Sequence, residues 1–73
     1  MQINNATELG DLIRKRRKSQ ELTIEELSML VPCSPRLLSE LERGKRGVSI
    51  GITLQVLAML GLVTDIKGRE ELR

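Results

Sequence analysis

Side chains that could do chemistry gather between Ser34 and Arg46. Arg36 is the second residue of a predicted helix, where its guanidinium could donate two parallel hydrogen bonds to O6 and N7 of a guanine. An exposed pair between Arg36 and Glu40 is the alternative, and we favour the base contact given the helices that position it. Glu40 could accept from cytosine N4 or pair with Arg36 or Arg43, and both interpretations stay open. This chemistry suits recognition of polar edges and phosphates.

A run of five cations, from Arg14 to Lys18, precedes this region. A solvated helical face with intrahelical ion pairs is the commoner explanation for such a run, and cations near a helix C-terminus also stabilise that helix. Contact with phosphates is the second explanation, and a groove-reading helix nearby favours it. At helical spacing Arg14, Arg17 and Lys18 share one side, whereas Arg16 leans toward the apolar stripe of the helix.

The composition excludes several classes of protein. The chain has no Phe, Tyr, Trp or His. It therefore lacks the aromatic platforms on which single-stranded nucleic acids stack, and also the usual general base and metal ligand. Cys33 is the one cysteine and is predicted to be a small, buried residue in place of an apolar turn residue. A catalytic role is not expected, because a catalytic cysteine would need a histidine. We expect no enzyme activity, no cofactor and no metal site.

The length of the chain and the pattern of its apolar residues predict its domain organisation and location. The chain has 73 residues and a net charge of +2. It is predicted to be a single domain over residues 1–73, with its core at about 6–66 and a charged tail at 67–73. No apolar run reaches the roughly 18 residues of a membrane span. The N-terminus also lacks a signal-peptide pattern, so we expect a cytoplasmic location and no membrane partner.

Capping residues and a proline define the first two predicted helices. Asn5 is the predicted N-cap of a helix that runs from Ala6 or Thr7 to Ser19. Thr23, with Glu26 at the capping-box position, begins a second helix. Pro32 ends that helix, because proline has no N–H and disfavours a helical residue before it.

A third helix follows directly after this turn. Ser34 is its predicted N-cap, Pro35 takes the first helical position and Gly44 stops it. Two short helices joined by a tight turn are the layout of a helix-turn-helix, whose second helix enters a DNA major groove. Ser34 and Ser39 could bind phosphate or bases, and Ser34 can do so while it caps the helix.

The last part of the chain is predicted to form a helix and a strand. The helix runs from Ser49 or Ile50 to Leu60, and its apolar residues cover more than one face, so it should also meet a second subunit. Residues 62–66, LVTDI, predict a short strand that pairs with its copy in that subunit. The predicted dimer interface comprises Ile52, Val56, Met59, Leu62, Val63, Thr64 and Ile66.

The chain resembles the helix-turn-helix domains of phage Cro and lysogeny repressors. The resemblance runs from LGDLIRKRRKSQELT through IEELSMLVPCSPRLLSELERGK to ITLQVLAMLGL, and SPRLLSELERGK is its most specific block. Within that superfamily the chain is most similar to the HipB-like antitoxins, which pair with kinase-like toxins. The resemblance implies an all-α fold, a bundle of about five helices with a C-terminal strand that pairs across a homodimer, and binding to a palindromic operator.

The resemblance also implies site residues by position. The groove-facing positions fall on Ser34, Pro35, Arg36, Ser39 and Glu40. The positions that touch the DNA backbone fall on Arg43, Lys45 and Arg46, and those near the flanking phosphates fall on Arg17, Lys18 and Thr23.

Three positions depart from the pattern of the family. Ile24 stands where the second helix usually begins with Gln, Pro32 stands where the turn usually has Gly, and Glu21 stands where the preceding connection often has Gly. Proline cannot adopt the positive φ that glycine permits. The departures predict an altered turn, and they concern DNA affinity and docking angle rather than the fold.

Two functions follow as hypotheses. The first is a sequence-specific, dimeric DNA-binding transcriptional repressor, an autoregulating antitoxin that also binds a kinase-like, HipA-type toxin. The alternative is a protein-interaction module that holds a toxin or partner regulator with weak or no DNA binding.

Overall fold

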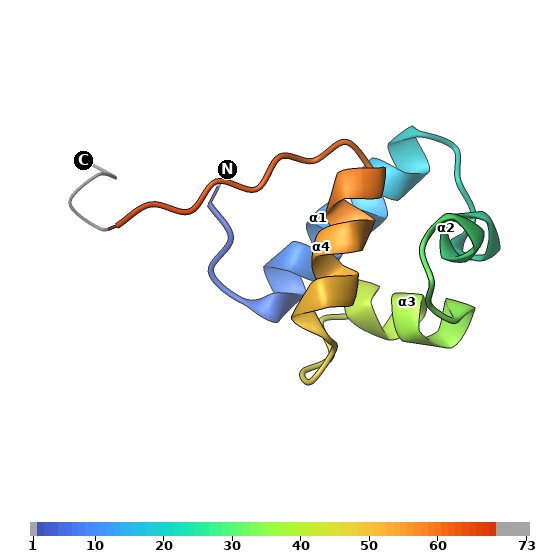
Figure 1. Cartoon of the computed structure of the whole chain (residues 1–73), viewed down its shortest axis with the longest axis horizontal. Helices are drawn as coiled ribbons and strands as arrows, with labels where there is room; N and C mark the ends of the chain where they lie inside the picture. The colour runs from blue at the N-terminus through green and yellow to red at the C-terminus, as the bar shows by residue number, and fades with distance from the viewer. Residues whose placement is uncertain (1, 69–73) are drawn as a thin grey trace.

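Four helices make up the computed structural model of the chain over the residues that it describes, 2–68. They are α1 (Ala6–Ser19), α2 (Ile24–Leu30), α3 (Pro35–Glu42) and α4 (Ile50–Met59). α3 packs against both α1 and α2, and α4 lies across the front of the bundle in Figure 1. The segment after α4 leaves the bundle as an extended chain.

Side-chain caps fix where the first two helices begin. Asn5 Oδ1 accepts from the N–H of Glu8 at 2.9 Å, although the Glu8 carboxylate turns back to the N–H of Asn4 rather than Asn5. At α2, Thr23 Oγ1 accepts from the N–H of Glu26 at 3.0 Å, and Glu26 Oε1 accepts from the N–H of Thr23 at 2.9 Å. The predicted caps of both helices, and the complete capping box at α2, are confirmed.

The hydrophobic core draws on all four helices. Its fully or almost fully buried members are Ile13, Leu27, Val31, Leu38, Leu41, Val56, Leu57 and Leu60. Leu30, at the end of α2, is 52% exposed. Because α2 ends there, its last turn lies at the rim of the core instead of inside it.

A close approach between α1 and the end of α3 requires a glycine. A Cβ built on Gly10 would lie 2.5 Å from the carbonyl oxygens of both Glu42 and Leu41. These are backbone atoms, which cannot move aside as a flexible side chain can. Gly10 therefore lets α1 cross the last turn of α3 at backbone contact.

The turn between α2 and α3 uses a conformation that proline permits. The N–H of Cys33 donates to the carbonyl of Val31, so Pro32 is the central residue of a γ-turn. Val31 before it is extended, with φ −124° and ψ 135°, as a residue before proline prefers. The turn needs no glycine because the direction of the chain reverses through an extended residue and the fixed φ of Pro32.

The connection between α1 and α2 has no glycine, and one of its residues therefore adopts a strained backbone conformation. Glu21 has φ +59°, the left-handed region, and is the one non-glycine residue with positive φ among the residues described. Its N–H donates to the carbonyl of Lys18 at 3.0 Å, which ends α1. The glycine that the family often has here would adopt this conformation without strain.

The fold prediction of five helices and a C-terminal strand is wrong. Between residues 2 and 68 there are four helices and no strand, and residues 62–68 have no regular secondary structure. A strand needs a neighbour that accepts its N–H groups, and residues 62–66 have none among residues 2–68. Residues 69–73, the rest of the predicted charged tail, lie outside the described part.

α4 is less enclosed than its composition suggested. Thr53, Val56 and Leu57 are buried, whereas Ile50 is 74% exposed. The predicted cap Ser49 precedes the helix but makes no side-chain capping bond. Across residues 2–68, no helix has both the length and the apolar composition for crossing a membrane.

Candidate nucleic-acid interface

The start of α3 is fixed by local chemistry. Ser34 Oγ accepts from the N–H of Leu37 at 3.1 Å, and Pro35 occupies the first turn. Leu38 and Leu41 are buried, so the opposite side of α3 faces outward. The prediction of a capped, proline-initiated third helix is confirmed.

The outward side of α3 is polar. Pro35, Arg36 and Arg43 are exposed, while Ser39 and Glu40 are half-buried. The Arg36 side chain is 88% exposed, and its Nε lies 3.8 Å from Glu40 Oε2. That distance is too long for a strong hydrogen bond, so the guanidinium is held only loosely.

The end of α3 is a Schellman turn. Gly44 has φ +80°, its N–H donates to the carbonyl of Leu41 at 3.0 Å, and the N–H of Lys45 donates to the carbonyl of Glu40 at 3.0 Å. The turn leads into the loop between α3 and α4, which we call the basic loop because it carries the exposed side chains of Lys45 and Arg46. The predicted stop at Gly44 is confirmed.

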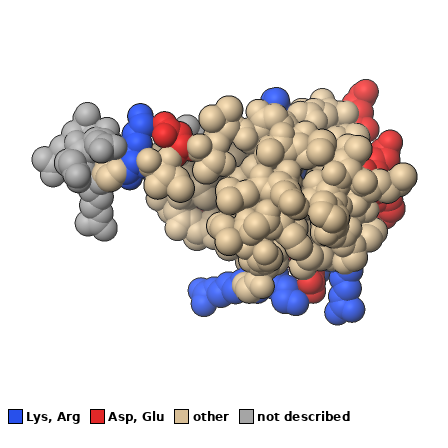
Figure 2. Space-filling model, viewed as in Figure 1, with Lys and Arg blue, Asp and Glu red and all other residues tan. Residues whose placement is uncertain are grey.

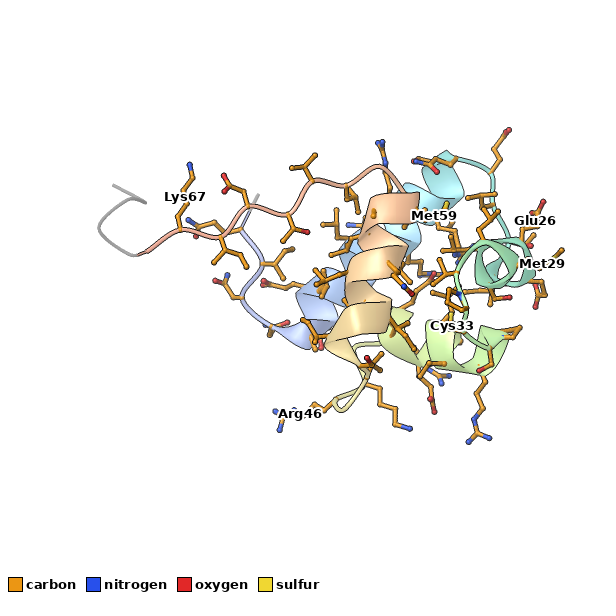
Figure 3. The ribbon with its side chains drawn as sticks, in the orientation of Figure 1. Glu26, Met29, Cys33, Arg46, Met59 and Lys67 are labelled. Atoms are coloured by element: carbon orange, nitrogen blue, oxygen red, sulfur yellow. The ribbon has the colours of Figure 1, made fainter. Side chains whose placement is uncertain are left out.

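Charge is unevenly distributed over the surface. Figure 2 shows Lys and Arg side chains projecting from the edge of the molecule below α3 and the loop after it. The face over α4 that looks toward the viewer is almost free of charge. Arg46 lies at the outer end of the basic loop, well away from the core (Figure 3). Lys45 and Arg46 therefore extend this basic edge beyond the C-terminal end of α3.

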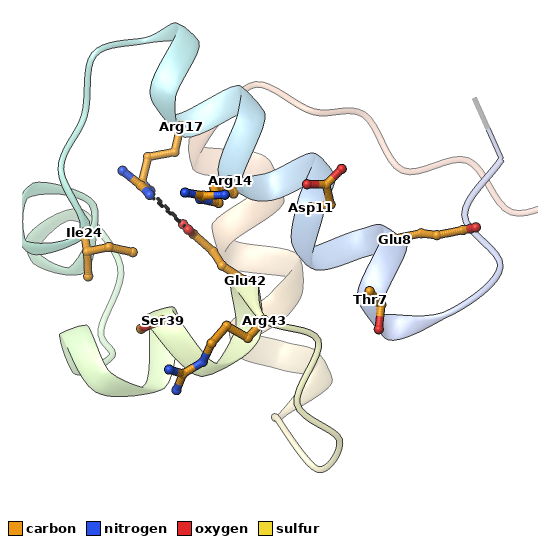
Figure 4. A pocket seen from close by; sticks show the side chains of 9 residues that line it. All are labelled: Thr7, Glu8, Asp11, Arg14, Arg17, Ile24, Ser39, Glu42 and Arg43. Carbon is orange, nitrogen blue, oxygen red and sulfur yellow. Dashed lines mark hydrogen bonds and ion pairs between the residues drawn. The ribbon is translucent and has the colours of Figure 1, made fainter.

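Arg17, expected near flanking phosphates, is instead part of the interior. Its Nε donates to Glu42 Oε2 at 2.7 Å, a second guanidinium nitrogen donates to Glu42 Oε1 at 3.0 Å, and the third donates to the carbonyl of Leu22 at 2.8 Å. The two side chains are 9% and 5% exposed. The hydrogen bonds from Arg17 to Glu42 raise the pKa of Arg17. Figure 4 shows Arg17 joined to Glu42. Because all three guanidinium nitrogens donate within the protein, we leave Arg17 out of the interface.

The remaining cations of the run point in different directions. Lys18 is exposed. Arg16 Nε and Gln20 Nε2 both donate to the carbonyl of Leu60, at 3.0 and 2.9 Å, so they cap the end of α4. The expectation that Arg16 leans toward the apolar side of α1 agrees with this contact. Thr23 is exposed, but its hydroxyl already caps α2.

Arg14 was placed on one side of its helix with Arg17 and Lys18 but was not among the predicted site residues. It lines an open hollow of about 540 Å³ between α1, α2 and α3, together with Ser39 and Arg43 (Figure 4). Ile24 also lines the hollow, so the departure from the usual Gln places an apolar side chain beside α3. The spacing of Arg14 from Arg17, three residues, was the signal that put both on one side of α1.

Cys33 is half-buried in the turn before α3. Burial raises the pKa of its thiol, so the sulfur is protonated near neutral pH. Cys33 lies in the turn as predicted, but it is half-buried rather than buried.

The predicted dimer residues divide between the interior and the surface. Val56 is fully buried in the core of its own chain, and Ile52 packs against that core. Met59 is 45% exposed, and Val63 and Ile66 are 93% and 90% exposed. Leu62 packs against the core, and Thr64 is exposed.

Comparisons with known proteins agree with this geometry. A family described as helix-turn-helix domain matches residues 8–71. The chain is also 38% identical, over 71 residues, to the uncharacterized HTH-type transcriptional regulator y4mF of Sinorhizobium fredii (strain NBRC 101917 / NGR234), and the match covers 97% of this chain and 93% of that protein. The comparisons confirm the predicted helix-turn-helix domain. The similarity to phage Cro and lysogeny repressors, and the HipB-like subtype, stay predictions. The chain belongs to the helix-turn-helix domain family.

Proposed function

We propose that the protein is a sequence-specific DNA-binding transcriptional regulator whose α3 enters the major groove. One observation carries the proposal: α3 buries Leu38 and Leu41 and turns its polar side outward, with a basic loop at its end. An exposed helix of this kind fits the width of a major groove. The family and the transcriptional regulator to which the chain is similar support the same function.

Arg36 is the proposed base-reading residue. Its side chain is 88% exposed and only loosely paired with Glu40, so little is lost when the guanidinium turns to the N7 and O6 of a guanine. Ser34, Pro35 and Ser39 lie along the same helix and would contact the groove beside it.

Phosphate contacts are proposed for cations on either side of α3. Arg43, Lys45 and Arg46 follow the helix, and Lys18 lies at the end of α1. Thr23 would contribute through its position at the start of α2. Each cation that neutralises a phosphate makes binding weaker as salt rises.

A homodimer on a palindromic operator is the proposed form of the regulator. Two recognition helices would then lie about 34 Å apart, one turn of B-DNA. Support comes from apolar side chains that remain on the surface of α4, where Ile50 is 74% exposed and Leu54 and Met59 are each 45% exposed. Burying them against a second copy would add to the small core of the chain. Occupancy of its own promoter would make the protein a repressor.

A second candidate function is a module that holds a partner protein, of which a kinase-like toxin is the proposed example. It is favoured by an open groove of about 390 Å³ that has no charged residue in its lining. The groove is lined by Leu30, Val31, Pro32, Gln55, Ala58 and Met59. An antitoxin would combine both functions, with DNA on α3 and the partner elsewhere.

Gel-shift titration with the protein's own promoter DNA tests the proposal. We expect a complex at submicromolar protein whose affinity falls steeply between low and high salt. No salt-sensitive complex at micromolar protein would remove the regulator function and leave the partner-binding one.

A further inference from the structure

Glu40 and Lys45 are joined twice, once through the backbone and once through their side chains. The N–H of Lys45 donates to the carbonyl of Glu40 at 3.0 Å, and Lys45 Nζ donates to Glu40 Oε2 at 2.9 Å. The first bond is part of the Schellman turn made by Gly44. Because that turn places Lys45 next to Glu40, the backbone at the end of α3 favours the ion pair between their side chains.

Glu40 is the more enclosed member of the pair. Its side chain is 15% exposed, against 58% for Lys45. The hydrogen bond from Lys45 lowers the pKa of Glu40, and the charges of Arg36 and Arg43 act in the same direction. Glu40 is therefore ionised near neutral pH, and in the free protein its carboxylate is the partner of the Lys45 ammonium.

We infer that Glu40 contributes to DNA specificity through its ion pair with Lys45. The pair keeps the Lys45 ammonium from the DNA phosphates until a base replaces Lys45 at the Glu40 carboxylate. The inference rests on the proposed function, in which α3 lies in the major groove and Lys45, just after α3, lies near the phosphate backbone of the DNA. An ammonium that is bound to a carboxylate cannot also neutralise a phosphate at full strength. A base that offers an amino group, such as cytosine N4, replaces Lys45 at the Glu40 carboxylate and frees it for the phosphate.

The protein then discriminates between its operator and other DNA through the contact of Lys45 with a phosphate, which is absent on other sequences. Contacts to phosphates supply essentially all of non-specific binding, because phosphates are present at every site. A cation that engages a phosphate only after its carboxylate partner has found a donor adds affinity only at the right base pair. Glu40 thus lowers the affinity for DNA of other sequences. Specificity increases when binding to the wrong partner is made weaker.

The test is a titration of four proteins: wild type, Glu40→Gln, Lys45→Ala and the double variant. Each is titrated against the promoter fragment and a scrambled fragment of equal length. Glu40→Gln should bind the scrambled fragment about eightfold more tightly at about 0.1 M salt and about twofold more tightly at about 0.5 M. These values follow from one added phosphate contact, which steepens the salt slope by about 0.9. In the Lys45→Ala background, Glu40→Gln should change little.

Asp65→Asn is the matched control. Asp65 pairs with Lys67 at 3.6 Å, so the change removes a carboxylate from a lysine pair outside α3 and should leave binding unchanged. Unchanged binding of Glu40→Gln to the scrambled fragment overturns the inference, as does an equal gain with and without Lys45. Failure of the wild type to bind the promoter fragment would instead reject the proposed function, and the inference with it.

Discussion

Arg17 and Glu42 join α1 to the end of α3 through a buried ion pair with two hydrogen bonds, at 2.7 and 3.0 Å. The third guanidinium nitrogen of Arg17 reaches the carbonyl of Leu22, just before α2. One side chain therefore links three parts of the helix-turn-helix. The pair fixes the angle at which α3 is presented, although it is too enclosed to be part of a contact surface.

Removing one partner of this pair should be costly. Glu42→Leu leaves the Arg17 guanidinium buried without its carboxylate, and the free energy of unfolding should fall by about 3–5 kcal/mol. Arg17→Met combined with Glu42→Leu should recover most of that loss, because an apolar pair replaces both charges. Urea denaturation measures both. Equal destabilisation of the single and double variants would contradict the account of the pair.

Two glycines in helices should respond oppositely to alanine. Gly10→Ala places a Cβ against the backbone of Leu41 and Glu42, and should lower the free energy of unfolding by about 1–3 kcal/mol or more. Gly51→Ala meets only Ser49 Oγ at 3.6 Å and should raise it by about 0.5–1 kcal/mol, since alanine favours helix. Thermal melts of the two variants provide the comparison. A Gly10→Ala protein as stable as the wild type would show that α1 and α3 do not approach as described.

The connection at Glu21 can be improved. Because Glu21 has φ +59°, Glu21→Gly should raise the free energy of unfolding by up to about 1 kcal/mol, the cost of a left-handed non-glycine residue less the added freedom of the unfolded chain. Glu21→Ala is the control, because alanine keeps the strain. A rise of equal size in both variants would point to the loss of the carboxylate rather than to the backbone.

Acid should weaken the start of α2. The N–H of Thr23 donates to the Glu26 carboxylate, and this bond, with that to the Thr23 side chain, lowers the pKa of Glu26. A folded-state pKa below the unfolded one gives stability that is complete above the unfolded pKa and is lost as pH falls through the folded pKa. The urea midpoint should therefore fall between about pH 5 and pH 3. It should fall less in Glu26→Gln, and equal pH profiles would contradict the role of the capping box.

Local chemistry made the helix boundaries predictable from the sequence. Asn5, Thr23 and Ser34 each cap a helix through a hydrogen bond to a residue three positions on. Gly44 and Gly61 end helices with φ of +80° and +74°. These signals lie within a few residues of the structure that they determine, so a single sequence contains them.

Long-range pairings were not predictable in the same way. Arg17 meets Glu42 across 25 positions, and Arg16 reaches the carbonyl of Leu60 across 44. A run of cations looks alike whether its members face solvent or the interior, so the run alone could not single out Arg17. The alternation at residues 62–66 likewise predicted a strand, but alternation does not supply the neighbour with which a strand must pair.

The central claim is that Arg36, on the outer side of α3, reads a base pair. Binding of the wild type and Arg36→Ala to the promoter fragment, and to fragments with single base-pair changes, tests it most directly. Arg36→Ala should cost about 1–3 kcal/mol of binding free energy and should lose discrimination at one base pair per half-site. Lys18→Ala, a proposed phosphate contact, should weaken all fragments alike and lower the salt slope by about 1. An Arg36→Ala protein that binds every fragment with the affinity of the wild type would contradict the claim.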